Sequence, residues 1–170
     1  KIIKMDNYFN ILNSIYHKID KQKIELFCNF LKNSINGGYI FCIGNGGSAS
    51  NMTHNVIDFN KININENRFR FISLCENFAS TTAISNDECY ENIFSEQLKN
   101  LMKKGDILFC VSVSGESKNI FKAIDYAKKM NNKVISITRT NSSLHISSDI
   151  CIDIPIFNYQ IIEDYHHIIT

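Results

Sequence analysis

The sequence predicts a three-layer α/β/α sandwich around a parallel sheet of about five strands, with extra helices at the N-terminus. The first observation is a set of short runs that are apolar at almost every position, at 39–43, 71–74, 107–111, 134–138 and 150–154. The second is that helical patterns separate these runs along much of the chain. Strands buried on both faces of a parallel sheet have this continuous apolar character, whereas half-exposed strands alternate. The 170 residues suit one compact domain of this kind.

The first 36 residues predict two helices. Apolar residues recur there at helical spacing, first at Tyr8, Ile11, Leu12, Ile15 and Ile19, and then at Ile24, Phe27, Phe30 and Leu31. The glycine pair at 37–38 is expected to end the second helix. We therefore expect a single domain over 1–170, with an N-terminal helical segment at 1–36 and an α/β core at 37–170.

Composition excludes several classes of protein. Hydrophobic residues make up 44% of the chain and charged residues 21%, which excludes a disordered or collagen-like polymer. The net charge is +1, which argues against a nucleic-acid or membrane-surface partner. The apolar runs are too short to span a bilayer, and the opening residues KIIKMDNYFN form no signal-peptide pattern. The six cysteines are widely spaced, which favours a reduced, cytoplasmic protein.

Two predicted strands lead into loops of small residues. The run at 39–43 is followed by the loop at 44–50, and the run at 107–111 by the loop at 112–117. Each loop precedes a helical pattern, and a helix N-terminus offers free backbone N–H groups and a partial positive charge. Ligands of open α/β sheets bind at the carboxyl ends of the strands, so we expect the functional site at these loops.

The residue types in the two loops favour a phosphate. Gly46 and Gly47 allow a close backbone approach, and the hydroxyl groups of Ser112, Ser114 and Ser117 add hydrogen-bond donors. The pattern G-x-x-x-x-G-K-[ST] is absent, which argues against a nucleotide triphosphatase. The alternative is an ordinary pair of strand–helix turns in which Ser caps the helix. Two such loops at neighbouring strand ends favour the phosphate site.

Three segments together resemble the phosphoheptose isomerase family of sugar-isomerase (SIS) domains. They are the stretch FCIGNGGSAS at 41–50, followed by His54 and an acid four residues later, TAISND at 82–87, and SVSGESKN at 112–119. The resemblance covers nearly the whole chain. It implies the flavodoxin-like SIS fold and a homotetramer that converts sedoheptulose 7-phosphate to D-glycero-D-manno-heptose 7-phosphate. That reaction leads to the heptose of lipopolysaccharide or capsule.

The resemblance also implies which residues contact the substrate. Ser112, Val113, Ser114 and Ser117 would hold the phosphate, and Val113 stands where the family usually has Thr. The other substrate-binding residues implied by the resemblance are Asn45, Gly46, Gly47, Ser48, Asn86, Asp87 and Glu163.

His54 and Asp58 are the candidate catalytic residues. They are four residues apart on a predicted helix and therefore share a face. A ketose–aldose isomerisation needs a base to move a carbon-bound proton and an acid to protonate oxygen. The resemblance places the catalytic Glu of the family at Asp58, whose side chain is one methylene shorter. It also allows a zinc ion on His54, Asp58 and Glu163. The alternative is that the pair lies on a solvated helix face.

The end of the chain carries further candidates. Glu163 stands at the position of a family Gln, and His166 matches the family's first His in this segment. The second His would fall just beyond Thr170, with His167 as the nearest substitute. Alternatively, one of these two histidines faces a neighbouring subunit and the other faces solvent. His145, outside the matched motifs, is expected on the surface.

Two functions stay open at this point. One is the isomerase, and the other is a non-catalytic SIS domain that binds a phosphosugar or a partner protein. The changes at Asp58 and Glu163 favour divergence from the enzyme. The absence of a basic patch argues against a nucleic-acid-linked module and favours the enzyme.

Overall fold

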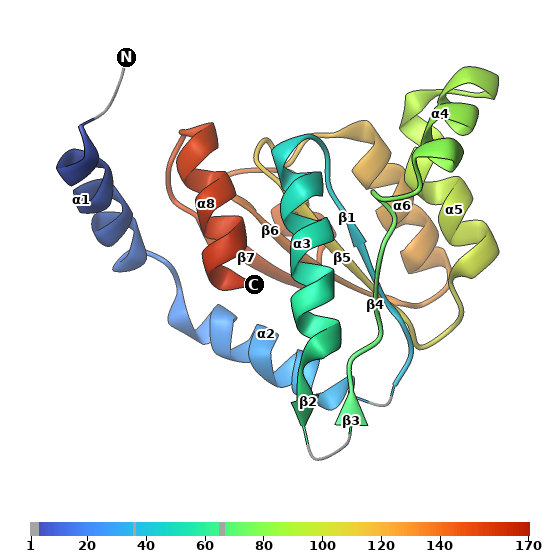
Figure 1. Ribbon diagram of the computed structural model, residues 1–170, viewed down its shortest axis with the longest axis horizontal. Helices are drawn as coiled ribbons and strands as arrows, with labels where there is room; N and C mark the ends of the chain where they lie inside the picture. Colours follow the sequence, from blue (N-terminus) through green and yellow to red (C-terminus); the bar gives the residue numbers. More distant parts are fainter. Residues whose placement is uncertain (1–3, 36, 65–66) are drawn as a thin grey trace.

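The computed structural model describes residues 4–35, 37–64 and 67–170. Its main sheet has five strands in the order β4-β1-β5-β6-β7, and every neighbouring pair is parallel (Figure 1). The predicted parallel sheet is therefore confirmed, with each strand on one of the predicted runs. The strands are β1 (Ile40–Ile43), β4 (Phe71–Ser73), β5 (Ile107–Ser112), β6 (Lys133–Arg139) and β7 (Ile150–Ile154).

Helices cover both faces of the sheet and complete the three predicted layers (Figure 1). Along β5, Phe109 packs into one apolar core and Leu108 into the other, as the alternation of a buried strand requires. The first core includes residues of α2 (Lys21–Asn33), α3 (Gly47–Lys61) and α8 (Tyr159–Ile169), and the second includes residues of α5 (Ile93–Leu101) and α6 (Lys118–Lys129).

The two predicted N-terminal helices are present as α1 (Met5–Tyr16) and α2. The Asp20 side chain caps α2 by accepting hydrogen bonds from two backbone N–H groups of its first turn. The helix ends at Asn33, before the glycine pair, because the backbone N–H of Ser34 closes the last turn on the Leu31 carbonyl. The expected end at 37–38 is therefore a few residues late.

The remaining elements are short. The helix α4 (Phe78–Asp87) follows β4. A two-stranded antiparallel sheet of β2 (Asn63–Ile64) and β3 (Asn67–Arg68) joins α3 to β4 and was not predicted, because two-residue strands carry no readable periodicity. In the described part of the chain, no helix has both the length and the apolar character needed to cross a membrane.

A buried histidine joins α8 to α3. His166 of α8 is fully buried, and its Nδ1 lies 3.3 Å from the Ser48 hydroxyl oxygen. Its Nε2 has no hydrogen-bond partner among the described residues. Burial lowers the pKa of His166 to about 3, because the charged imidazolium would lose its hydration. His166 is therefore neutral at neutral pH and lies in the interior of the chain. The alternative in which it faces solvent or a neighbouring subunit is wrong.

We expect this histidine to make stability depend on pH. Between about pH 6.5 and 3 the unfolded chain protonates this side chain and the folded chain does not, so the free energy of unfolding falls as the pH falls. The slope from this one group reaches about 1.4 kcal/mol per pH unit. Urea denaturation near pH 7 and near pH 5 measures the change in the free energy of unfolding with pH. His166→Leu should reduce this slope by about 1.4 kcal/mol per pH unit. The control His17→Leu, at an exposed site, should retain the slope. Equal slopes in the native chain and in His166→Leu would contradict this.

Candidate active site

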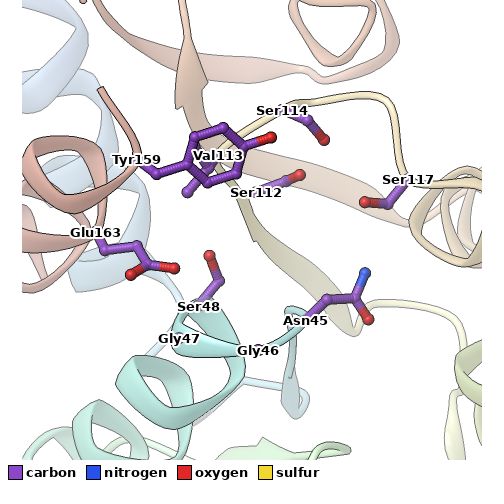
Figure 2. A pocket seen from close by; sticks show the side chains of 10 residues that line it. All are labelled: Asn45, Gly46, Gly47, Ser48, Ser112, Val113, Ser114, Ser117, Tyr159 and Glu163. Carbon is purple, nitrogen blue, oxygen red and sulfur yellow. The ribbon is translucent and has the colours of Figure 1, made fainter. Parts of the chain in front are cut away.

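A cavity of about 240 Å³ lies where the two predicted loops meet (Figure 2). The loops follow β1 and β5, which pair in parallel, so their carboxyl ends open at the same edge of the sheet. The lining residues are Asn45, Gly46, Gly47, Ser48, Ser112, Val113, Ser114, Ser117, Tyr159 and Glu163. Nine of these ten residues were predicted, and Tyr159 was not.

The loop after β1 presents the first turn of α3 to the cavity. Gly46 has φ +55° and ψ −125°, a conformation that L side chains rarely adopt. Gly47 begins the helix, and a Cβ atom at this position would overlap the carboxylate of Glu163. The earliest backbone N–H groups of a helix have no intrahelical acceptor, so they remain available to a ligand. The two glycines therefore leave space at the start of α3, which the Glu163 carboxylate approaches.

The loop after β5 presents three serines, and two of them hold the loop itself. The Ser112 hydroxyl accepts a hydrogen bond from the backbone N–H of Gly115 at 3.0 Å, and that of Ser114 accepts one from Glu116 at 3.2 Å. Ser117 is the N-cap residue of α6, yet its side chain makes no capping hydrogen bond. Its hydroxyl points toward the cavity (Figure 2). The capping alternative therefore does not describe Ser117, which keeps its hydroxyl available.

Two asparagines join the two loops. The Asn45 amide donates to the Asn119 side-chain oxygen at 3.0 Å, and the Asn119 amide donates back to Asn45 at 2.8 Å. The Tyr90 hydroxyl also donates to the Asn45 oxygen at 2.8 Å. This reciprocal pair fixes the start of α6 against the loop after β1, and so sets the width of the cavity.

The cavity contains no lysine or arginine among its lining residues. Arg139, at the end of β6, lies behind the loop after β5, where its Nε donates to the Ser114 carbonyl oxygen at 3.0 Å. The positive partial charges at the cavity are therefore those of two helix N-termini, while Glu163 supplies a carboxylate and Arg139 supports one loop from outside. Arg139 was not predicted, although its place at the end of the next strand was a usable signal. Tyr159, at the start of α8, belongs to no sequence motif that would have predicted its place in the cavity.

His54 and Asp58 form the predicted pair, but outside this cavity. His54 Nε2 lies 3.2 Å from Asp58 Oδ2, and the two side chains are 63% and 61% exposed. The His54 ring lies edge-on to that of His167, with centroids 5.1 Å apart. His167 Nδ1 is in turn 3.0 Å from the Asn55 side-chain oxygen. The prediction that His54 and Asp58 share one face of a helix is confirmed. Together with His167, they form an exposed polar group between α3 and α8.

Asn86 and Asp87 are likewise outside the cavity. They are exposed in the last turn of α4, and the Asn86 amide donates to the Asp87 carboxylate at 2.9 Å. Glu163, by contrast, lines this cavity and also a second, larger hollow beside α1. The structure thus gathers the residues of both loops with Glu163 and leaves His54, Asp58, Asn86 and Asp87 exposed outside the cavity.

Comparisons with known proteins agree on one family. The SIS domain family model matches residues 7–139. A phosphoheptose isomerase of Helicobacter pylori is 33% identical over 148 residues, which cover 86% of this chain and 76% of that protein. The solved phosphoheptose isomerase of Francisella tularensis is 25% identical with a TM-score of 0.87, covering 97% of this chain and 91% of that one. The structure from Neisseria gonorrhoeae has a TM-score of 0.85 at 24% identity, covering 95% and 90%. This chain belongs to the SIS domain family and, within it, to the phosphoheptose isomerases.

Proposed function

We propose that this chain converts sedoheptulose 7-phosphate to D-glycero-D-manno-heptose 7-phosphate. This would be an entry step to the heptose of lipopolysaccharide or capsule, carried out in the cytoplasm. The observation that carries the proposal is the cavity in which two helix N-termini and the free Ser117 hydroxyl converge, in a chain of the phosphoheptose isomerase family. A phosphosugar with an extended polar chain suits a cavity lined mainly by backbone, hydroxyl and amide groups.

The phosphate is assigned to the loop at 112–117. Free N–H groups at the start of α6, the partial positive charge of that helix and the Ser117 hydroxyl favour a dianion there. Glu163 lies on the far side of the cavity, beside Gly47 (Figure 2). Its negative charge would repel a phosphate and suits the hydroxyl groups of a sugar, so the substrate would run from the loop after β5 toward α8.

The proton transfer is assigned to Asp58 with His54. The base removes a proton from C1 of the ketose while the acid protonates the C2 carbonyl oxygen, which gives an enediol. The base then returns a proton to C2, and the C1 hydroxyl gives its proton back to the acid as the aldehyde forms. The pair is exposed and lies outside the cavity of its own chain, so this assignment requires that a second copy cover it. Exposed apolar side chains next to the pair, Ile57 on α3 and Ile168 on α8, favour such a contact.

A zinc ion does not fit the described arrangement of its proposed ligands. His54 and Asp58 bring two donor atoms within 3.2 Å, but Glu163 does not join them in a group of three within 4.8 Å among the described residues. The proton transfer above is therefore assigned to side chains alone.

The second candidate function is a non-catalytic phosphosugar-binding module. The observation that favours it is the exposure of His54 and Asp58, which leaves the cavity without the proposed base. Both functions share the phosphate site and differ in turnover, so binding and turnover have to be measured on the same protein.

Ser117→Ala should weaken binding of sedoheptulose 7-phosphate. A hydrogen bond to a charged group contributes about 1.5–3 kcal/mol, so the dissociation constant should rise about tenfold or more. Titration calorimetry measures it, with Ser14→Ala on the exposed side of α1 as the matched control. Because Ser117 makes no capping hydrogen bond, the fold should be unaffected. An unchanged dissociation constant in Ser117→Ala would refute the phosphate assignment.

Asp58→Asn should lose turnover and keep substrate binding. Loss of a general base costs about a hundred- to ten-thousandfold in rate, while the amide keeps the size of the carboxylate. Initial rates of isomerisation measure the effect, with the exposed Asp125→Asn on α6 as the control. Asp58→Glu, the family residue, should keep or raise the rate. An Asp58→Asn variant as active as the native chain would place the base elsewhere.

The chain should assemble as a homotetramer. Exposed apolar residues on the N-terminal helices, among them Met5, Phe9 and Leu26, exceed what packing on the sheet uses. Light scattering at micromolar concentration should give four times the chain mass of 19.5 kDa. A monomeric mass would count against both the assembly and the proposed role of the exposed pair.

A further inference from the structure

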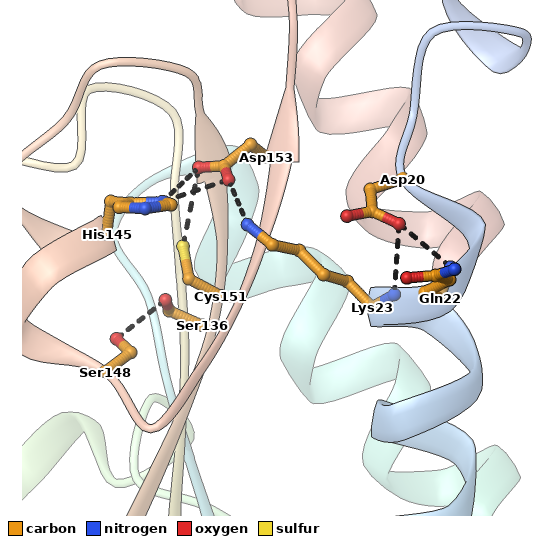
Figure 3. Close-up of polar contacts among 8 residues, drawn as sticks. All are labelled: Asp20, Gln22, Lys23, Ser136, His145, Ser148, Cys151 and Asp153. Atoms are coloured by element: carbon orange, nitrogen blue, oxygen red, sulfur yellow. Dashed lines mark hydrogen bonds and ion pairs between the residues drawn. The ribbon is translucent and has the colours of Figure 1, made fainter.

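A second group of chemically reactive side chains lies on and beside the edge strand of the sheet (Figure 3). None of its residues lines the cavity. Strand β7 is the last strand of the sheet, and Ile152 and Ile154 point from it into an apolar core. Cys151 and Asp153 alternate with these isoleucines and so leave the opposite face of the strand. The short helix α7 (Leu144–Ser147) lies over that face and carries His145. Imidazole, thiol and carboxylate therefore meet at one place.

The donor atoms of these three residues are already close to one another. His145 Nδ1 lies 3.1 Å from Asp153 Oδ1 and 3.0 Å from Oδ2, and Cys151 Sγ lies 3.6 Å from Oδ1. All three donors lie within 4.8 Å of one another. Around a tetrahedral ion with metal–nitrogen and metal–oxygen bonds of about 2.0–2.1 Å and a metal–sulfur bond of about 2.3 Å, neighbouring donors are about 3.3–3.6 Å apart. Only small side-chain shifts would therefore close the group around an ion.

A neighbouring lysine orients the carboxylate. Lys23 of α2 reaches Asp153 Oδ2 at 2.6 Å, which leaves Oδ1 facing Cys151 and His145 (Figure 3). The Asp153 side chain is only 17% exposed. Second-shell contacts of this kind hold ligating carboxylates in place in metal sites. Lys23 thus holds Oδ2, which also lies 3.0 Å from His145 Nδ1, and Oδ1 contacts the other two proposed ligands.

The thiol is protonated until a cation arrives. Cys151 is buried, and burial raises its pKa to about 11. A divalent ion that bonds to sulfur would release one proton from the thiol to solvent, and it would exchange one water ligand for each protein donor.

We propose that His145, Cys151 and Asp153 bind a divalent transition-metal ion of the zinc class, with water as the fourth ligand. Thiolate and imidazole select zinc, cobalt or cadmium over magnesium and calcium, which prefer oxygen. The ion would tie α7 to the edge strand β7. The site shares no residue with the cavity or with the His54–Asp58 pair, so it stands independently of the proposed function.

Cobalt titration of the metal-free full chain tests the proposal, because cobalt bonded to a thiolate gives a charge-transfer band in the near ultraviolet. We expect a band that saturates at one cobalt per chain and disappears when zinc is added. Cys151→Ser should abolish it, and Asp153→Asn should weaken it. The first control is Cys28→Ser, which removes an exposed cysteine outside the proposed site. The second is His54→Ala: a cobalt ion bound at the His54–Asp58 pair would have no sulfur ligand and so could not produce the thiolate band. Both controls should retain the band.

Thermal unfolding supplies a second readout that detects misfolded variants. Zinc should raise the melting temperature of the native chain and of Cys28→Ser, and should leave that of Cys151→Ser unchanged. The proposal is overturned if the native chain gives no thiolate band, if Cys151→Ser keeps the band, or if zinc stabilises Cys151→Ser as much as the native chain.

Discussion

The parallel pairing of β1 with β5 is the constraint on which the cavity depends. Ile43 and Cys110 stand side by side in register, so the loops that follow the two strands emerge together at one edge of the sheet. Each loop turns directly into a helix, and the two helix N-termini therefore face the same space. A shift in this register would separate the two loops and remove the cavity, whatever residues the loops contain.

The second requirement is that the loops keep their shape without a ligand. The reciprocal amide pair of Asn45 and Asn119 holds one loop against the start of α6. Ser112 and Ser114 hold the other loop by accepting backbone hydrogen bonds, and Arg139 supports it from behind. Preorganised donors reduce the entropy that a ligand must lose on binding. Several side chains of the cavity are therefore already hydrogen-bonded within the protein, whereas the Ser117 hydroxyl is available to the ligand.

The sequence predicted the parts of the fold and of the cavity that local patterns determine. The continuous apolar runs indicated the strands, and residue types in the two loops indicated Gly46, Gly47, Ser112, Ser114 and Ser117. The family resemblance implied four further lining residues, Asn45, Ser48, Val113 and Glu163. Tyr159 was missed because its role arises from where α8 begins in space, which no local pattern records. Arg139 was missed although it lies at the end of β6, at the edge of the sheet where ligands of such folds bind. The interior place of His166 was also not predicted, because it depends on the packing of α8 against α3, where His166 lies beside Ser48. The metal-ligand group on β7 and α7 has no motif, since its three residues share only a tertiary position.

The central claim is that a cavity built from backbone and hydroxyl groups supports isomerisation when copies of the chain assemble. Incubation of the native chain with sedoheptulose 7-phosphate in deuterated water, followed by nuclear magnetic resonance, tests this most directly. Proton transfer through an enediol, with exchange of the proton held by the base, predicts deuterium at C1 of the ketose and at C2 of the aldose, together with the appearance of the aldose phosphate. A protein that binds the sugar but produces neither exchange nor aldose would contradict the claim and leave a phosphosugar-binding module.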